Sequence, residues 1–244
     1  MRIRSFHIDA FGTLRDVTAE GLPEAGAVFL GHNEAGKSTL LSVVSGLEPL
    51  TAGTVEVDGA PVRGPSGKVG FMPQRDQLFP WRTIRDNVTL GLTVTKKRTP
   101  ETLAYADALL KRYGLWEFAG KRPSQLSGGM RQRCALIRTM ATNPKILLLD
   151  EPFSALDFQT RLSVSSDISR IIRQEGKTAL LVTHDISEAI SLSDRIFVLS
   201  ARPAVVKSTH DLTALQNLSP LERRDTEAFH TYFQAIWKEL DHHE

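Results

Sequence analysis

Apolar residues follow two patterns along this chain, and the two patterns alternate over most of its length. Five short runs are apolar at nearly every position: residues 27–30, 69–72, 145–149, 179–182 and 196–199. Such runs are typical of strands that are covered on both faces of a sheet. Stretches with apolar residues at helical spacing lie between them, among them residues 39–47 and 157–174. This alternation predicts an α/β fold with a mostly parallel core sheet and helices on its faces.

The first third of the chain shows a different strand pattern. Apolar and polar residues alternate from Phe6 to Ala10, a second strand is expected over residues 14–19, and residues 54–57 alternate up to the pair Asp58-Gly59. A period of two indicates strands with one exposed face, and Asp-Gly is a hairpin signal. These segments predict a small antiparallel β subdomain beside the core sheet.

Residues 79–133 interrupt the strand pattern and are expected to be mainly helical, with Thr99-Pro100 starting one helix and Gly114 ending it. We therefore expect a single domain over residues 1–244. Residues 1–78 and 134–220 would form the core with the β subdomain, residues 79–133 an inserted helical subdomain, and residues 221–244 a C-terminal helix.

Six apolar residues of that C-terminal helix lie at helical spacing: Phe229, Tyr232, Phe233, Ile236, Trp237 and Leu240. We expect their face to dock on the body of the protein rather than on a membrane, because the opposite face mixes acids and bases instead of being rich in lysine. The four serines between residues 163 and 169 are expected to face solvent.

Composition and charge narrow the possible functions. The 244 residues carry a formal net charge of +2, which gives no support for nucleic acid as the main partner. The apolar runs are too short to span a bilayer, and the N-terminus lacks an apolar signal core, so we expect a cytosolic chain. A single cysteine, Cys134, excludes an internal disulfide framework and is expected to be a buried core residue.

One glycine-rich stretch fits G-x-x-x-x-G-K-[ST], the phosphate-binding loop of P-loop nucleotide hydrolases. Its residues are Gly31, His32, Asn33, Glu34, Ala35, Gly36, Lys37, Ser38 and Thr39. The glycines let successive backbone N–H groups point at phosphate oxygens, Lys37 adds a positive charge, and the Ser38 hydroxyl can ligate Mg²⁺. The predicted strand before it and the predicted helix after it provide the context that such a loop requires.

Three polar residues follow the central apolar runs. Asp150 and Glu151 come directly after one run, and His184 follows the next. Because the carboxyl ends of parallel strands meet at one edge of a sheet, we expect these side chains to lie close together. Asp150 would reach a Mg²⁺ ion beside Ser38, Glu151 could act as general base on water, and His184 could donate to a γ-phosphate.

A second glycine pair opens a predicted helix at Ser127, Gly128 and Gly129. A helix N-terminus of this kind can bind an anion, and a two-fold dimer would let it face the nucleotide of the partner subunit. A plain glycine turn into a helix explains the same residues equally well at this point.

The ordered set GHNEAGKST, LSGGMRQR and LLLDEP resembles the ATP-binding subunits of ABC (ATP-binding cassette) transporters over nearly the whole chain. The resemblance implies an ATPase that uses ATP and Mg²⁺. It implies that Gln74 is the Q-loop residue that contacts Mg²⁺, Asp150 the Walker B aspartate, Glu151 the catalytic glutamate and His184 the switch histidine. It also implies that residues 127–129 contact ATP on the opposite subunit and that residues 154–157, ending in Asp157, form the D-loop at the dimer seam.

Residues 71–81, 151–157 and 193–203 look like those of the importers of nitrate, sulfonates and taurine. That resemblance implies two permease subunits, a second copy of the ATPase or a related subunit, a separate substrate-binding protein, and a place on the inner face of the cell membrane. Phe79, Pro80 and Trp81 would then lie where a permease docks, although each could equally pack the core of the helical subdomain.

Two features depart from the importer pattern. The loop interior Asn33-Glu34-Ala35-Gly36 and the N-terminal residues look more like SMC- and RecF-type DNA-repair ATPases, which gives a DNA-maintenance protein as the alternative function. The interval from Gln74 to Ser127 shows no sustained heptads, which argues against the long coiled coil of that class. The usual aromatic residue that stacks on adenine is also displaced; Phe11 is the candidate and Phe6 the alternative.

Overall fold

The computed structural model describes residues 5–11, 14–20, 26–31, 36–49, 52–57, 60–201 and 203–241. Its centre is a six-stranded sheet with the order β10-β9-β3-β8-β7-β6. The strands are β3 (Gly26–Leu30), β6 (Val69–Met72), β7 (Ile146–Asp150), β8 (Thr178–Thr183), β9 (Arg195–Leu199) and β10 (Val206–Asp211). All neighbours pair in parallel except β10, which runs antiparallel to β9 at one edge.

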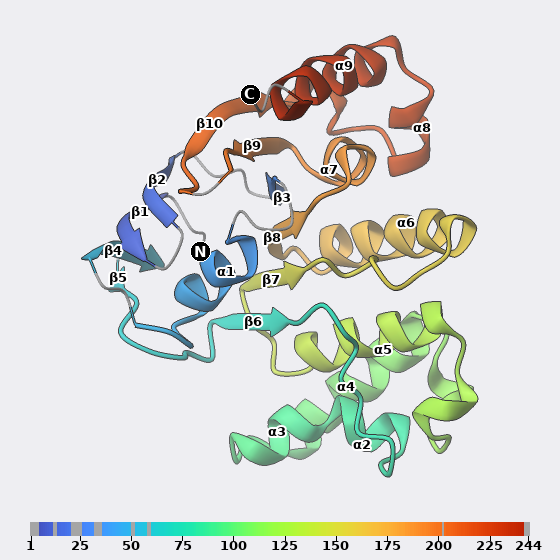
Figure 1. The fold of residues 1–244 in the computed structure, drawn as a ribbon. Helices are drawn as coiled ribbons and strands as arrows, with labels where there is room; N and C mark the ends of the chain where they lie inside the picture. The colour runs from blue at the N-terminus through green and yellow to red at the C-terminus, as the bar shows by residue number, and fades with distance from the viewer. Residues whose placement is uncertain are drawn as a thin grey trace.

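Both faces of the central sheet are buried, which explains its continuous apolar runs. Along β3, Val28 and Leu30 belong to one apolar cluster, whereas Ala27 and Phe29 belong to another. Successive side chains of a strand point to opposite faces, so the two clusters are the two sides of the sheet. Helices α1 (Lys37–Ser45), α6 (Phe158–Gln174) and α7 (Ile186–Leu192) provide the cover (Figure 1).

A second sheet is antiparallel and has the order β2-β1-β4-β5. Its strands are β1 (Ser5–Phe11), β2 (Leu14–Glu20), β4 (Ala52–Val57) and β5 (Ala60–Pro61). In the register of the first pair, Ile8 lies opposite Val17, and both side chains are fully buried. The predicted antiparallel β layer is confirmed, while the turn pair Asp58-Gly59 lies outside the described residues.

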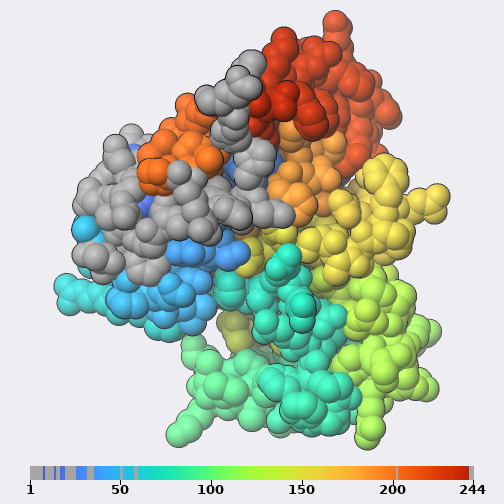
Figure 2. All heavy atoms as spheres, in the orientation of Figure 1, coloured from blue at the N-terminus to red at the C-terminus, as the bar shows by residue number. Residues whose placement is uncertain are grey.

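The segment between β6 and β7 is helical. It contains α2 (Ile84–Val88), α3 (Leu90–Val94), α4 (Pro100–Arg112) and α5 (Gly128–Met140), with short 3₁₀ turns at Trp116–Phe118 and Pro123–Gln125. Thr99 caps α4 by accepting from the Thr102 N–H, and Gly114 follows the helix with φ +71°. Figure 2 shows these helices, in green, as a lobe below the blue, yellow and orange parts of the molecule. The subdomain boundaries proposed from the sequence stay a prediction.

The C-terminal region differs from the sequence expectation in three places. Strand β10 was not predicted, and residues 221–244 contain two helices, α8 (Pro220–Arg224) and α9 (Glu227–Asp241). On α9, Phe229 and Ile236 are buried, but Trp237 is 54% exposed and stacks on Phe233 at 6.2 Å between ring centroids. Trp237 is therefore not part of the face that docks on the body of the protein, and fewer than the six expected residues form that face.

Three other expectations concern the serines of α6, the single cysteine and the end of α1. Ser165 and Ser169 are buried, so the prediction that all four serines of α6 face solvent is wrong. Cys134 is free and fully buried, as predicted, and burial raises the pKa of its thiol to about 12. Helix α1 ends at Ser45, earlier than predicted, because Gly46 takes a left-handed conformation with φ 76°.

None of the helices in the described part of the chain has the length and apolar character needed to cross a membrane.

Candidate active site

The N-terminus of α1 holds Lys37 at the carboxyl ends of two central strands. Gly36 precedes it in a left-handed conformation with φ 73°, which glycine adopts without strain. The side chain of Lys37 is 3% exposed, and its Nζ donates to the carbonyl oxygens of Gly31 at 2.7 Å and Thr183 at 3.1 Å. Burial lowers the pKa of Lys37, and the nearby carboxylates of Glu151 and Asp150 oppose that shift. The ammonium is thus fixed where ligands bind in open α/β sheets.

Ser38 and Asp150 form a pair of oxygen-bearing side chains next to this lysine. The Ser38 hydroxyl donates to Asp150 Oδ1 at 3.0 Å. Asp150 is the last residue of β7 and is 8% exposed. Burial raises the pKa of Asp150, while the hydrogen bond from Ser38 and the charge of Lys37 act in the opposite direction. The predicted proximity of Ser38 and Asp150 therefore exists in the structure.

Glu151 is the point at which the predicted residues converge. Its Oε1 lies 3.4 Å from Lys37 Nζ and 3.1 Å from His184 Nδ1, and its Oε2 accepts from Gln74 Nε2 at 3.2 Å. The main chain of Glu151 has φ 42°, a conformation that non-glycine residues adopt only at a cost of about 1–3 kcal/mol. Such strain is concentrated at functional sites, because the surrounding contacts must hold it in place.

Two further residues contact this cluster: Ser154, which the resemblance placed in the loop at residues 154–157, and Thr183, which sequence reasoning did not single out. Ser154 donates its hydroxyl to the carbonyl oxygen of Glu151 at 3.1 Å, and Gln74 also lies 3.4 Å from the Ser154 hydroxyl. Thr183 contributes a carbonyl oxygen to Lys37. A backbone acceptor leaves no signature in a sequence, so Thr183 could be found only from the end of the predicted strand.

Ser127 and Asp157 do not join this cluster in any contact of the described residues. Ser127 caps α5 by accepting from the Met130 N–H at 3.3 Å, and Asp157 caps α6 by accepting from the Thr160 N–H at 3.0 Å. The hydrogen bond from Thr160 lowers the pKa of Asp157. Both residues thus have a structural role within one subunit, whatever they contact across a dimer.

The two glycines after Ser127 lie close to α6 and the loop before it. A Cβ added at Gly128 would meet Leu156 Cδ2 at 3.2 Å, and one at Gly129 would meet Val164 Cγ2 at 2.7 Å. Real Cβ contacts essentially never fall below 3.0 Å, so close packing alone accounts for Gly129. The structural explanation and the ligand-binding explanation of these glycines are therefore compatible.

Some predicted residues cannot be placed. His32, Asn33, Glu34 and Ala35 lie outside the described residues, as do the side chains of Phe6 and Phe11, so the adenine contact stays a prediction. In the described part of the chain, no three His, Cys, Asp or Glu side chains form a group that could hold a metal ion. A metal at this site would therefore depend on the Ser38–Asp150 pair and on oxygens that a ligand supplies.

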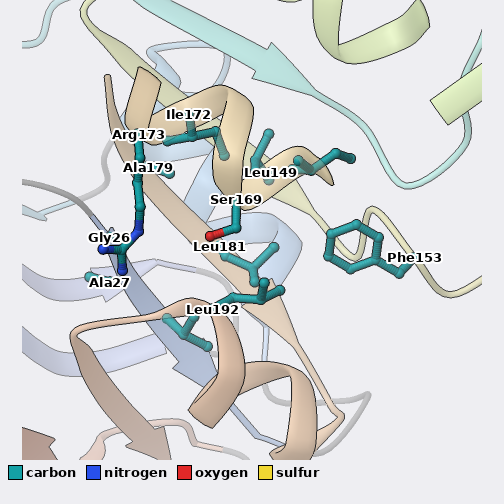
Figure 3. Close-up of a pocket in the computed structure, with 12 residues that line it drawn as sticks. Gly26, Ala27, Leu149, Phe153, Ser169, Ile172, Arg173, Ala179, Leu181 and Leu192 are labelled. Atoms are coloured by element: carbon teal, nitrogen blue, oxygen red, sulfur yellow. The ribbon is translucent and has the colours of Figure 1, made fainter. Parts of the chain in front are cut away.

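A pocket elsewhere in the core is apolar and too small for a nucleotide. It has a free volume of about 30 Å³ and lies beneath α6 (Figure 3). Leu149 and Leu181 of the sheet line it together with Phe153 and Ile172, and Arg173 and Ser169 supply its polar atoms. A space of this size holds about one or two water molecules. It therefore belongs to the packing between α6 and the sheet rather than to the Glu151 cluster.

Comparison with known proteins identifies relatives of this arrangement. A family model described as ABC transporter matches residues 14–154. The ABC transporter ATP-binding protein YtlC of Bacillus subtilis is 47% identical over 214 residues, which is 87% of this chain and 82% of that protein. The taurine import ATP-binding protein TauB of Rhizobium johnstonii is 44% identical over 192 residues, covering 78% and 73% of the two chains. The nitrate import ATP-binding protein NrtD of Synechocystis sp. is 42% identical over 178 residues, covering 73% and 67%.

A solved structure supports the same fold. A dimeric ATP-binding cassette in a post-hydrolysis state, bound to ADP and Pi, superposes with a TM-score of 0.68 and 29% sequence identity, covering 86% of this chain and 97% of that one. These comparisons give no support to the DNA-maintenance alternative.

Proposed function

This chain belongs to the ABC transporter family of ATP-binding proteins, and from that premise we propose that it is the ATP-hydrolysing subunit of an importer for a small anionic solute. The observation that carries the proposal is the convergence of Lys37, Gln74 and His184 on the carboxylate of Glu151. A base, a cation and two polar groups at one sheet edge are what phosphoryl transfer to water requires.

The phosphates of ATP would bind at the N-terminus of α1. Lys37 is already fixed there, and its ammonium would exchange the carbonyl oxygens of Gly31 and Thr183 for β- and γ-phosphate oxygens. Burial lowers the pKa of Lys37, and the negative charge of the phosphates, like that of the neighbouring carboxylates, would favour the charged ammonium. Gly31, residues 32–35, Gly36 and Thr39 would supply the backbone N–H groups of the cradle.

Mg²⁺ fits the Ser38–Asp150 pair. The two oxygens lie 3.0 Å apart, both are hard ligands, and Mg²⁺ in such sites takes one or two protein oxygens together with substrate phosphates. When bound, the ion neutralises charge that develops on the phosphates. Gln74 would be the third contributor from the protein, as the resemblance to ABC transporter ATP-binding subunits implies.

Glu151 would act as general base. Its carboxylate would accept a proton from the attacking water, and His184 Nδ1, at 3.1 Å, orients that carboxylate. Gln74 contacts the other carboxylate oxygen and would report the presence of the γ-phosphate to the loop that follows β6. Catalysis here is positioning and electrostatic stabilisation, with no covalent intermediate on the protein.

A second copy of the chain would complete the site. The N-terminus of α5, with Ser127, Gly128 and Gly129, offers backbone N–H groups and the positive end of the helix dipole to an anion. Within one subunit these residues make no contact with the Lys37–Glu151 cluster among the described residues. A two-fold dimer would place them on the nucleotide of the partner, with Asp157 at the seam.

We infer the remaining partners from what the named relatives are described as importing. Import ATP-binding proteins for taurine and nitrate are among them, so we infer a permease in the membrane, a cytoplasmic position on its inner face, and a substrate-binding protein on the other side. Both of those solutes carry an anionic group, which is why a small anion is the proposed class. The identity of the solute would be determined by the permease and the binding protein.

Replacing Glu151 by glutamine tests the proposal. Glu151→Gln keeps the shape of the side chain but cannot accept a proton, so ATP hydrolysis should fall by at least about 100-fold while ATP binding persists. Gel filtration with ATP and Mg²⁺ should then show a stable dimer. Glu117→Gln, at an exposed position of the helical region, serves as the control and should match the wild type. Rapid hydrolysis by Glu151→Gln would remove Glu151 from the role of base.

A further inference from the structure

We propose that Arg161 is a positioning residue that couples the loop at residues 154–157 to His184. The inference rests on the proposed function, because it assigns Arg161 a part in aligning His184 for ATP hydrolysis. Arg161 lies in the first turn of α6, and in the described part of the chain its hydrogen bonds and ion pairs do not include Lys37 or Glu151. Its effect would therefore be transmitted through its neighbours.

The guanidinium of Arg161 joins two segments that are distant in the sequence. Its Nη2 donates to the carbonyl oxygen of Leu156 at 3.1 Å, in the loop before α6. Its Nη1 donates to Asp185 Oδ2 at 3.3 Å, in the residue after His184. The planar fork of arginine suits this task, because one rigid group can reach acceptors on both sides.

Beyond Arg161, three residues next to His184 form a hydrogen-bonded turn: Thr183, Asp185 and Glu188. The Asp185 N–H donates to Thr183 Oγ1 at 3.1 Å, and Thr183 Oγ1 donates to Glu188 Oε2 at 2.8 Å. Asp185 Oδ1 in turn accepts from the Glu188 N–H at 3.0 Å, which caps α7. The two residues that flank His184, Thr183 and Asp185, are therefore both held by hydrogen bonds. The His184 ring lies between them in the chain, and its Nδ1 is 3.1 Å from Glu151 Oε1.

The buried carboxylate of Glu188 makes the free energy of the folded protein depend on where the Arg161 guanidinium lies. The side chain of Glu188 is buried, and burial raises the pKa of this carboxyl. Arg161 Nε lies 3.7 Å from Glu188 Oε1, within ion-pair range, yet this Nε is a buried atom that makes no hydrogen bond within the described part of the chain. A buried donor without an acceptor costs free energy, so a small shift of Arg161 toward Glu188 would be favourable.

The loop on the other end of the network is the one expected at the dimer seam. Leu156 packs beside Gly128 at the start of α5, and its side chain is 8% exposed. Closure of a partner subunit on residues 154–157 would move the Leu156 carbonyl, and Arg161 would carry that displacement to Asp185 and His184. Assembly of the dimer would thus align the histidine that orients the catalytic base.

A double-mutant cycle on the full-length chain tests this coupling. Arg161→Ala should lower kcat for ATP by about tenfold with KM changed by less than about twofold, because the contact acts after ATP binds. In the His184→Ala background, the same substitution should change the single-turnover rate by less than about twofold, since the residue it acts through is gone. Arg161→Lys keeps the charge but loses the planar fork, so its kcat should lie between those of the wild type and Arg161→Ala. It replaces Arg161→Ala in both backgrounds if the alanine variant does not fold.

The matched control is Arg170→Ala on the same helix, where the arginine is 60% exposed and pairs with its helix neighbour Asp167; it should behave as the wild type. Equal losses from Arg161→Ala in the wild-type and His184→Ala backgrounds would overturn the coupling while leaving the ATPase assignment intact. An unchanged kcat would overturn it as well. If the wild-type chain itself failed to hydrolyse ATP, both the coupling and the proposed function would be wrong.

Discussion

Asp150 and Glu151 are neighbours in the chain but have different surroundings. Asp150 is the last residue of β7, is buried, and accepts a hydrogen bond from the Ser38 hydroxyl. Glu151 leaves the strand through a left-handed backbone conformation and turns toward Lys37. Two adjacent carboxylates with unlike environments can take separate roles, one holding a cation and one accepting a proton.

The pKa of Asp150 leads to a prediction about stability and pH. Burial raises this pKa in the folded protein, so the folded state binds the proton more tightly and the contribution of Asp150 to stability falls as pH rises from the unfolded pKa to the folded one. At neutral pH the buried charge costs stability. Asp150→Asn should therefore raise the Tm of protein purified without nucleotide at pH 7, and the difference should vanish below the ordinary aspartate pKa.

Hydrolysis should respond in the opposite direction, because the amide is a poorer Mg²⁺ ligand: we expect a loss of at least about tenfold in the Asp150→Asn variant. Asp225→Asn, at an exposed position, provides the control and should leave both Tm and rate unchanged. A lower Tm for Asp150→Asn would mean that the carboxylate is a net stabilising group.

At the scale of elements, the contact between α5 and α6 depends on the lack of a side chain at Gly129. The side chains that face this glycine, Val164 and Thr160, are β-branched and restricted in χ1, so they cannot easily move aside. The start of α5 is therefore held against α6 at a distance that only glycine permits.

Gly129→Ala should lower the free energy of unfolding by about 1–3 kcal/mol, the usual cost of overpacking, despite the better helix propensity of alanine. In a chain of this size, each 1 kcal/mol corresponds to a Tm shift of about 2–4 °C. Gly120→Ala is the matched control, because no atom lies within 4 Å of an added Cβ there. Equal Tm values for the two variants would show that α5 can move away from α6 without cost.

A buried arginine fixes helix α8 to the end of α7 and to the residues just before β9. Arg223 is fully buried, donates to the carbonyl oxygens of Ile190 and Ser193, and contacts Asp194 Oδ1 at 3.3 Å. Arg173 of α6 contacts the same oxygen at 3.2 Å. One aspartate thus links two helices to the start of β9.

Removing Arg223 should be strongly destabilising. Arg223→Ala leaves a cavity and withdraws a partner from the buried Asp194, and breaking a buried pair costs about 3–5 kcal/mol. Urea unfolding would measure this loss, with Arg98→Ala, at an exposed position, as the reference. A loss below about 1 kcal/mol would show that Arg173 alone satisfies Asp194.

At the scale of the whole molecule, the loop after β6 presents an aromatic surface on a rigid support. Trp81 is 67% exposed and contacts Phe79 edge to face at 5.2 Å. Phe79 is fixed by Asn87, whose fully buried side chain accepts from its N–H at 2.7 Å and donates to its carbonyl oxygen at 3.2 Å. The exposure of Trp81 favours docking of the permease over core packing for that residue.

Trp81→Ala should leave ATP hydrolysis by the isolated protein unchanged, because none of the contacts of Glu151 described above involves Trp81. Binding to permease in detergent should weaken by about tenfold or more, as expected for an aromatic residue at an interface. Trp116→Ala is the matched control, since that tryptophan is 41% exposed and lies under Lys111 at 4.6 Å. Equal retention of permease by both variants would contradict the docking role of Trp81.

Much of this architecture could be predicted from the sequence because strong local signals agree with it. Continuous apolar runs gave the central strands, Thr99 and Asp157 marked helix starts, and the ordered motifs located Lys37, Gln74, Asp150, Glu151 and His184. Parallel topology then required Glu151 and His184 to lie at one edge, which the structure confirms.

The features that were missed depend on tertiary contacts. Strand β10 alternates only half-buried and exposed positions and contains mostly polar residues, so its sequence resembles a loop. The left-handed conformation of Glu151 and the backbone acceptor at Thr183 leave no trace in residue type. Ser165 and Ser169 are buried although they are polar, and a buried hydroxyl can satisfy its own helix, as Ser165 does by donating to the carbonyl oxygen of Leu162.

The contacts that hold Glu151 have a consequence for when such a protein hydrolyses ATP. Lys37, Gln74 and His184 all lie against one carboxylate, and a carboxylate accepts about four hydrogen bonds, so these neighbours leave an incoming water little of its accepting capacity. Hydrolysis would be faster once at least one of these three neighbours moves away. In the absence of transported solute, ATP hydrolysis would therefore be slow, because it is restrained by the same side chains that later take part in the reaction.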